Sequence, residues 1–124
     1  MIGYVTLGTN DVERAGAFYD PIADILGIGR IATSDSMIMW GVPGQGAMLA
    51  ATKPFDKQAA TAGNGTMVGL VAQNREQVHQ VYDHALANGG SEEGAPGPRT
   101  EQFYGAYFRD PDGNKLVVYE WKEG

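Results

Sequence analysis

Residues 109–114 read Arg-Asp-Pro-Asp-Gly-Asn, and the mostly apolar run Lys115–Glu120 follows them directly. Pro111 fixes φ at the first corner of a turn, and Gly113 tolerates the positive φ that reverses the chain. An aromatic run, Phe103–Phe108, precedes the turn. The stretch therefore predicts a β-hairpin near the C-terminus. Its aspartates are interpreted as turn formers and not as a catalytic carboxylate pair.

The outline of this hairpin also occurs earlier in the chain. Met37–Trp40 and Met48–Thr52 are apolar, and the Gly- and Pro-rich stretch 41–46 lies between them. An offset of 68 places Pro43 on Pro111. At an offset of 63, identical residues align elsewhere, namely Val5 with Val68, Leu7 with Leu70, Glu13 with Glu76, Tyr19 with Tyr82 and Asp20 with Asp83. We interpret this pattern as a duplication, in which each half reads β-α-β-β-β.

The first half begins with a short β-type run, Tyr4–Leu7. Asn10 and Glu13 have the spacing of a capping box, which predicts a helix with Asn10 as its N-cap. Apolar residues continue at helical spacing to Leu26, and Pro21 predicts a kink or break within the helix. Further strands are expected near residues 30–33, 37–40 and 47–52.

The second half repeats this order. Thr66–Ala72 is another β-type run, and Asn74 is the expected N-cap of a second amphipathic helix that ends at Gly89. The Gly- and Pro-rich stretch Ser91–Arg99 is predicted to be a loop that leads into the C-terminal hairpin. Polar, small residues between the halves predict a linker.

Composition limits the class of protein. A chain of 124 residues with 43% hydrophobic residues fits one domain with a core of its own. The absence of cysteine excludes disulfides, thiolate metal sites and a cysteine nucleophile. The net charge of −6 argues against nucleic-acid binding. No leader-like or membrane-spanning stretch occurs, so we expect a cytoplasmic protein without a membrane partner.

Three stretches together resemble a known family: Tyr4–Tyr19, Gly94–Arg99 and Tyr107–Asn114. They are similar to the glyoxalase / bleomycin-resistance / extradiol dioxygenase (vicinal oxygen chelate) superfamily, in particular its small bacterial glyoxalase-like members. The resemblance implies a single α+β domain, residues 1–124, with two βαβββ modules. The modules, 1–53 and 66–124 with a linker at 54–65, are expected to form a cupped, barrel-like mixed sheet with helices outside. Members are usually homodimers.

Enzymes of this superfamily bind a divalent metal through the first and last strand of each module. Their usual ligands are His, Glu or Gln. The corresponding positions here are Tyr4, Leu49, Met67 and Val117. Of these side chains, the Tyr4 phenol alone could ligate, and His79 and His84 both fall in the second helix. The sequence therefore predicts that the metal site is lost and that no cofactor is bound.

Alternation along the strands predicts the ligand cavity instead. Aromatic rings near the cavity could stack on a planar ligand, and an arginine could pair with a carboxylate or phosphate. The expected ligand-binding set is Tyr4, Trp40, Leu49, Met67, Arg99, Tyr104, Tyr107, Val117 and Tyr119. The alternative for the aromatic side chains is ordinary packing inside the sheet. For Arg99 it is a surface or dimer-interface position.

Three functions remain open from the sequence. The first is a metal-free protein that binds a small aromatic or apolar molecule. The second is a glyoxalase-type lyase or isomerase, or a dioxygenase-related enzyme, that uses Tyr4 or an unidentified catalytic residue. The third is a structural or interaction module whose cavity is filled.

Overall fold

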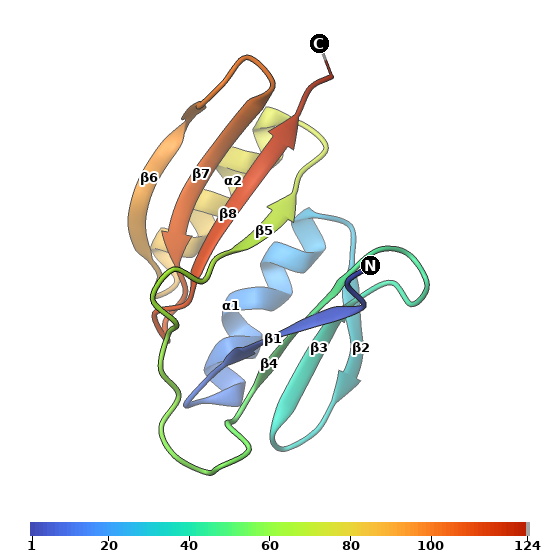
Figure 1. Ribbon diagram of the computed structural model, residues 1–124, viewed down its shortest axis with the longest axis vertical. Helices are drawn as coiled ribbons and strands as arrows, with labels where there is room; N and C mark the ends of the chain where they lie inside the picture. Colours follow the sequence, from blue (N-terminus) through green and yellow to red (C-terminus); the bar gives the residue numbers. More distant parts are fainter. Residues whose placement is uncertain (124) are drawn as a thin grey trace.

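The computed structural model describes residues 1–123 and shows two βαβββ modules (Figure 1). Module one contains β1 (Tyr4–Gly8), α1 (Val12–Ile25), β2 (Gly29–Thr33), β3 (Met37–Gly41) and β4 (Met48–Thr52). Module two contains β5 (Val68–Val71), α2 (Arg75–Ala87), β6 (Ser91–Pro98), β7 (Phe103–Arg109) and β8 (Lys115–Trp121). The predicted α+β architecture is confirmed.

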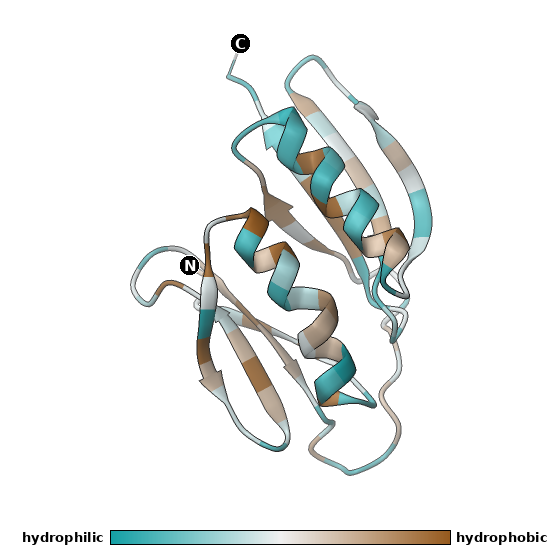
Figure 2. Ribbon diagram, turned by 180° about the vertical axis from the view of Figure 1, so that it is seen from behind, coloured by the Kyte–Doolittle hydropathy of each residue, from teal (hydrophilic) through white to brown (hydrophobic). Residues whose placement is uncertain are grey.

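Each module has its own four-stranded mixed sheet, and the two sheets do not close into a barrel. The strand orders are β1-β4-β3-β2 and β5-β8-β7-β6, with β1–β4 and β5–β8 parallel and the other neighbours antiparallel. Both helices cover the same side of the sheets (Figure 2). We call the opposite side, which faces the viewer in Figure 1, the open face.

The hydrophobic core lies between the sheets and the helices. Leu7 of β1 and Leu116 of β8 point toward the helices and are buried, as alternation along the strands predicts. The helices also contact each other, since Nε2 of His84 lies 2.9 Å from the Phe18 carbonyl oxygen and Nε2 of Gln77 donates to the Ile25 carbonyl oxygen at 3.1 Å. One continuous core therefore joins the two modules.

The predicted N-cap is confirmed for α2 and is wrong by one residue for α1. Asn74 caps α2, because its Oδ1 accepts a hydrogen bond from the Gln77 amide at 2.9 Å. The cap of α1 is Asp11 and not Asn10, and Asp11 Oδ1 accepts from the Arg14 amide at 3.0 Å. The Asn10 side chain instead accepts from the Ala60 amide at 2.7 Å. A tertiary contact therefore moved the cap by one residue.

Pro21 does not break α1, which runs without interruption from Val12 to Ile25. The proline removes one backbone donor, but Phe18, Tyr19 and Ile22 on either side of it are buried. The free energy gained by burying this apolar stripe exceeds the loss of one helical hydrogen bond.

The predicted loop 91–99 is wrong over most of its length, because Ser91–Pro98 forms strand β6. This strand lies at the edge of its sheet, and its register with β7 shifts between Glu92 and Gly94 and again between Gly94 and Gly97. Edge strands accept prolines and glycines because one side of the backbone needs no partner. The turn-like composition therefore concealed an irregular strand.

The hairpin turn at Asp110–Asn114 docks module two onto module one. Asp112 Oδ2 accepts from the Thr9 hydroxyl at 2.6 Å, and Oδ1 accepts from the Asn10 amide at 2.9 Å and from Arg14 at 2.6 Å. Asn114 Nδ2 donates to the Gly8 carbonyl oxygen at 2.9 Å. The turn is therefore also an intermodule contact, which its sequence did not indicate.

Among residues 1–123, no helix is both long enough and apolar enough to cross a bilayer.

Candidate functional site

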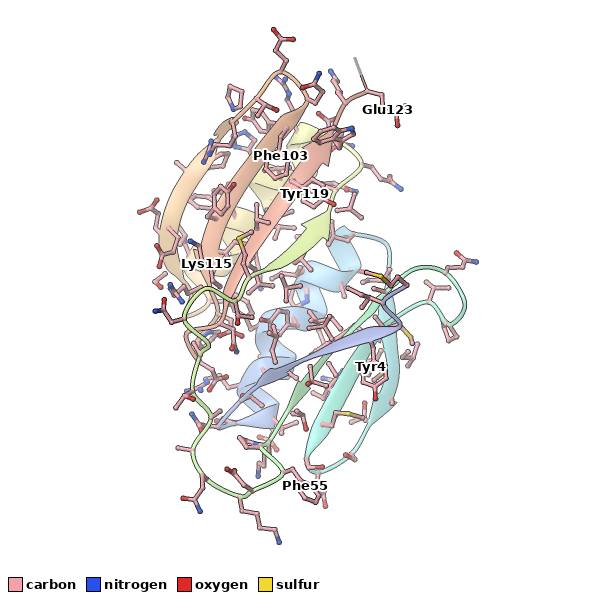
Figure 3. All side chains as sticks on the ribbon, in the orientation of Figure 1. Tyr4, Phe55, Phe103, Lys115, Tyr119 and Glu123 are labelled. Atoms are coloured by element: carbon pink, nitrogen blue, oxygen red, sulfur yellow. The ribbon has the colours of Figure 1, made fainter. Side chains whose placement is uncertain are left out.

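The open face of module two carries a group of aromatic side chains. The register pairs Gly105 of β7 with Tyr119 of β8, and Tyr107 with Val117, so these four residues share one face. Phe103 lies on the same face and stacks on Tyr119, with ring centroids 4.9 Å apart and planes 10° from parallel. Figure 3 shows these two labelled rings side by side on the sheet. A planar molecule could extend such a stack.

The Phe103 ring lies over a glycine of its own strand. Gly97 of β6 pairs with Gly105 of β7. A Cβ at Gly105 would lie 2.8 Å from Cε1 of Phe103 and 3.3 Å from Cγ2 of Val117. The missing side chain at Gly105 therefore lets the Phe103 ring lie close to the sheet, where it stacks on Tyr119.

Two cations approach the ring of Tyr107. The Arg99 guanidinium carbon lies 5.3 Å from the ring centroid, and Lys115 Nζ lies 5.7 Å from it. Arg99 also donates to the carbonyl oxygens of Ala95 at 2.7 Å and of Gly97 at 2.9 Å. These contacts hold the guanidinium folded back along β6, over the open face.

The open face of module one is less aromatic. Tyr4 is 59% exposed on β1, and the register pairs it with Met48. Met39 of β3 pairs with Ala50 and shares this face. Met67, which directly precedes β5, is 45% exposed. Tyr4 thus lies on edge strand β1, whereas Met67, which was predicted to lie within the first strand of module two, directly precedes edge strand β5.

A groove lies between the modules, behind the open face. Its volume is about 330 Å³, and its walls come from the second half of α1, the β3–β4 connection and strand β5. Trp40, Leu49 and Tyr119 all line it. Tyr119 therefore borders both this groove and the stacked aromatic surface.

Trp40 and Leu49 reach the groove from the helix side. Trp40 pairs with Leu49 in the sheet, is 2% exposed, and donates from Nε1 to Asp20 Oδ1 at 2.8 Å. Arg30 holds the same carboxylate through two hydrogen bonds of 2.8 and 2.7 Å. The hydrogen bond from Arg30 lowers the pKa of Asp20, and the Trp40 indole acts in the same direction.

Tyr104 lies outside this groove and away from the open face. Its hydroxyl is 2.7 Å from Nε2 of His79 in α2, and the Arg75 guanidinium carbon lies 4.4 Å from its ring centroid. Its register partner Glu120 is 3.8 Å from Arg75. The structure therefore places Tyr104 on the helix side of the sheet and away from the other residues of the predicted set.

In the last strand of each module, the predicted alignment of Leu49 with Val117 is wrong by one residue. Thr6 pairs with Ala50 in module one, whereas Gly69 pairs with Val117 in module two. Ala50 and not Leu49 is therefore the counterpart of Val117. The connection between β3 and β4 is one residue longer than the connection between β7 and β8, which shifts the alignment and turns Leu49 to the other face.

The four positions of the superfamily metal do not fit a divalent cation. With the corrected register they are Tyr4, Ala50, Met67 and Val117, and alanine and valine have no donor atom. Within residues 1–123, no group of three or more His, Cys, Asp or Glu side chains is arranged to hold a metal. The chemistry of these side chains therefore gives no support to metal binding at this position.

Phe103 was missing from the predicted site. It alternates with Gly105 and Tyr107 along β7, so the parity of the strand would have placed it on the open face. Lys115 was expected on this face from alternation along β8, but its proximity to Tyr107 depends on the pairing of the two strands.

Comparisons with known proteins agree with this architecture. The sequence profile described as "Glyoxalase/Bleomycin resistance protein/Dioxygenase superfamily" matches residues 1–118. The chain belongs to this superfamily. No curated protein sequence gives a significant match.

Solved structures of superfamily proteins resemble the chain over almost their whole length. A glyoxalase/bleomycin resistance protein from Albidiferax ferrireducens T118 is 35% identical, with a TM-score of 0.89 over 98% of this chain and 99% of that one. A glyoxalase-related enzyme from Fulvimarina pelagi is 19% identical, with a TM-score of 0.75 over 100% of this chain and 92% of that one. A superfamily enzyme from Burkholderia phytofirmans PsJN gives 19% identity and a TM-score of 0.74 over 97% and 98%.

Proposed function

We propose that this superfamily member is a small-molecule-binding protein that takes a planar, mostly apolar ligand on the open face of module two. The observation that carries the proposal is the Phe103–Tyr119 stack on the open face. A half-buried pair of stacked rings provides a surface for a further ring and few polar groups to desolvate.

The ligand is proposed to bind without a divalent metal. The side chains at the four metal positions cannot form a coordination sphere, so the glyoxalase and ring-cleavage reactions that depend on the metal find no support in this chain. Binding of the ligand therefore depends on ring stacking.

The assembly that binds is proposed to be a homodimer. Tyr4, Val71 and Trp121 are 59%, 66% and 55% exposed, and all lie on the sheets away from the helices. Large apolar side chains gathered on one face favour contact with another protein surface. A second copy of the chain would cover the open face and enclose the ligand. Sedimentation that shows a monomer at the highest attainable concentration would contradict this assembly.

Binding of a neutral aromatic probe tests the proposed ligand surface. We expect naphthalene carboxamide to bind the wild-type protein. The Phe103→Ala variant should raise the dissociation constant about tenfold, since one aromatic contact contributes about 1–1.5 kcal/mol. Phe55→Ala is the matched control, because Phe55 is 102% exposed in the segment between the modules. Calorimetry that gives equal affinities for the two variants would contradict the site.

The proposed absence of metal binding is tested separately. We expect no stoichiometric metal and no rise in melting temperature when the purified protein is exposed to zinc, nickel, manganese or ferrous ions, because the four positions lack ligands. Stoichiometric metal together with a clear rise would overturn the proposal and favour a lyase or dioxygenase function.

A further inference from the structure

We propose that the ligand of module two is an aromatic carboxylate, with its ring on the Phe103–Tyr119 stack and its acid group on Arg99. This inference rests on the proposed function and specifies the chemical class of the ligand. Charge is distributed unequally within module two.

Positive charge gathers on the open face. Lys115 pairs with Arg109 across β7 and β8, so both lie on the face that carries Tyr107. The Arg99 amide donates to the Phe103 carbonyl oxygen at 2.8 Å, which places Arg99 beside the aromatic stack. Arg99 therefore lies nearer the stack, and Arg109 and Lys115 lie at the turn end of the same face, in a chain whose net charge is −6.

Two acidic side chains of this sheet already have cationic partners. Glu93 Oε1 is bound by Arg109 Nε at 2.5 Å, which balances one of the three cations. Glu120 lies on the helix side of β8, within 3.8 Å of Arg75. The open face therefore keeps excess positive charge beside Tyr107, and such a site favours an anionic ligand.

Arg99 is fixed in place by the backbone of β6. Its two terminal nitrogens each donate to a carbonyl oxygen of that strand, those of Ala95 and Gly97. These bonds use two of the five N–H donors of a guanidinium and leave the others for a ligand. An ordered guanidinium loses little side-chain entropy when it binds a carboxylate through a bidentate contact.

Two glycines make room for this conformation. A Cβ at Gly94 would lie 3.3 Å from one terminal nitrogen of Arg99, and a Cβ at Gly97 would lie 3.1 Å from the other. Side chains at these positions would displace the guanidinium from the strand.

The two cations approach Tyr107 from opposite ends. Arg99 pairs with Phe103, four residues before Tyr107, whereas Lys115 pairs with Arg109, two residues after it. The Arg99 guanidinium folds back from that end along β6 toward Tyr107, past Gly97, which pairs with Gly105. A carboxylate attached to a stacked ring would meet this guanidinium between the stack and Tyr107, and Lys115 would add longer-range attraction.

The test compares naphthalene carboxylate with naphthalene carboxamide by calorimetry, because the two probes share a shape and differ in charge. We expect the wild-type protein to bind the carboxylate about tenfold more tightly, as one charge-assisted contact allows. Arg99→Met should remove this preference and leave carboxamide binding unchanged. Arg99→Lys should keep part of the preference, because it retains the charge but loses the bidentate geometry.

Lys53→Met is the matched control, since Lys53 is an exposed cation in the segment between the modules and should not affect either probe. Equal binding of the two probes, with Phe103→Ala weakening both, would overturn the carboxylate inference and leave the proposed function intact. A carboxylate preference that survives in Arg99→Met would also overturn it. Failure of both probes to bind the wild-type protein would contradict both proposals.

Discussion

At the scale of single residues, Tyr19 shows how one hydroxyl joins the two modules. Its oxygen donates to Asp110 Oδ2 at 2.6 Å, and the ring is 3% exposed in the core. Asp110 Oδ1 also accepts from the amides of Asp112 and Asn114, each at 2.9 Å. Burial raises the pKa of Tyr19 well above its ordinary value, and the charge of Asp110 raises it further.

This raised pKa predicts a loss of stability in alkali. The contribution of Tyr19 is complete below about pH 10, where the tyrosine of the unfolded chain is still protonated. As the pH rises toward the pKa of the folded state, the unfolded chain releases its proton first. Stability then falls by about 1.4 kcal/mol per pH unit from this one residue.

We therefore expect Tyr19→Phe to be about 1–2 kcal/mol less stable than wild type at neutral pH, because it loses one hydrogen bond to a charged acceptor. The difference should shrink above about pH 10, since phenylalanine does not titrate. Urea unfolding across this pH range measures both effects. A difference that stays constant with pH would show that Tyr19 is not the group responsible.

At the scale of elements, the connection from α2 to β6 has almost no free volume. A Cβ at Gly90 would lie 2.6 Å from the Ala85 carbonyl oxygen and 2.7 Å from the Arg109 carbonyl oxygen. Both atoms belong to the backbone, one at the end of a helix and one in a strand, so neither can move independently. The glycine allows the helix to end directly against the sheet.

Gly90→Ala should therefore lower the free energy of unfolding by more than about 2 kcal/mol. Gly29→Ala is a suitable control, because no heavy atom lies within 4 Å of a Cβ built at Gly29. We expect the control to change stability by less than about 0.5 kcal/mol. Similar melting temperatures for the two variants would contradict the steric explanation.

At the scale of the whole molecule, the Asp110–Asn114 turn and the helix contact hold the modules together. The Asp112 side chain is 2% exposed, and all three of its donors outside the turn belong to module one. Removing this carboxylate leaves the buried Thr9 hydroxyl and the exposed donors of Asn10 and Arg14 without this partner across the junction. The two modules should therefore lose stability together.

Asp112→Ala should lower the free energy of unfolding by about 2–3 kcal/mol and keep a single transition. Asp35→Ala is the control, because Asp35 lies exposed in the short connection between β2 and β3. Fluorescence reports on both modules, since Trp40 belongs to module one and Trp121 to module two. Two separate transitions in the wild-type protein would contradict a shared core.

Much of the open face of module two follows from the sequence itself. Lys115, Val117 and Tyr119 lie on the face where alternation along β8 placed them, because successive side chains of a strand point to opposite faces. The turn at Pro111–Gly113 was also predictable, since Gly113 adopts φ of 89° as such a turn requires. These features depend on neighbours a few residues apart.

Other features depend on contacts between distant parts of the chain. The pairing of β1 with β4 decided that Ala50 and not Leu49 lies on the side of the sheet that we call the open face. Packing on α1 turned Trp40 toward the helices. The pairing of β6 with β7 brought Arg99 toward Tyr107. The sequence by itself determined the order of the elements and the parity within most strands. The register between strands and the packing of one module on the other were decided by tertiary structure. Both depend on hydrogen bonds and buried contacts between segments that are far apart in the sequence, and no local pattern predicts them.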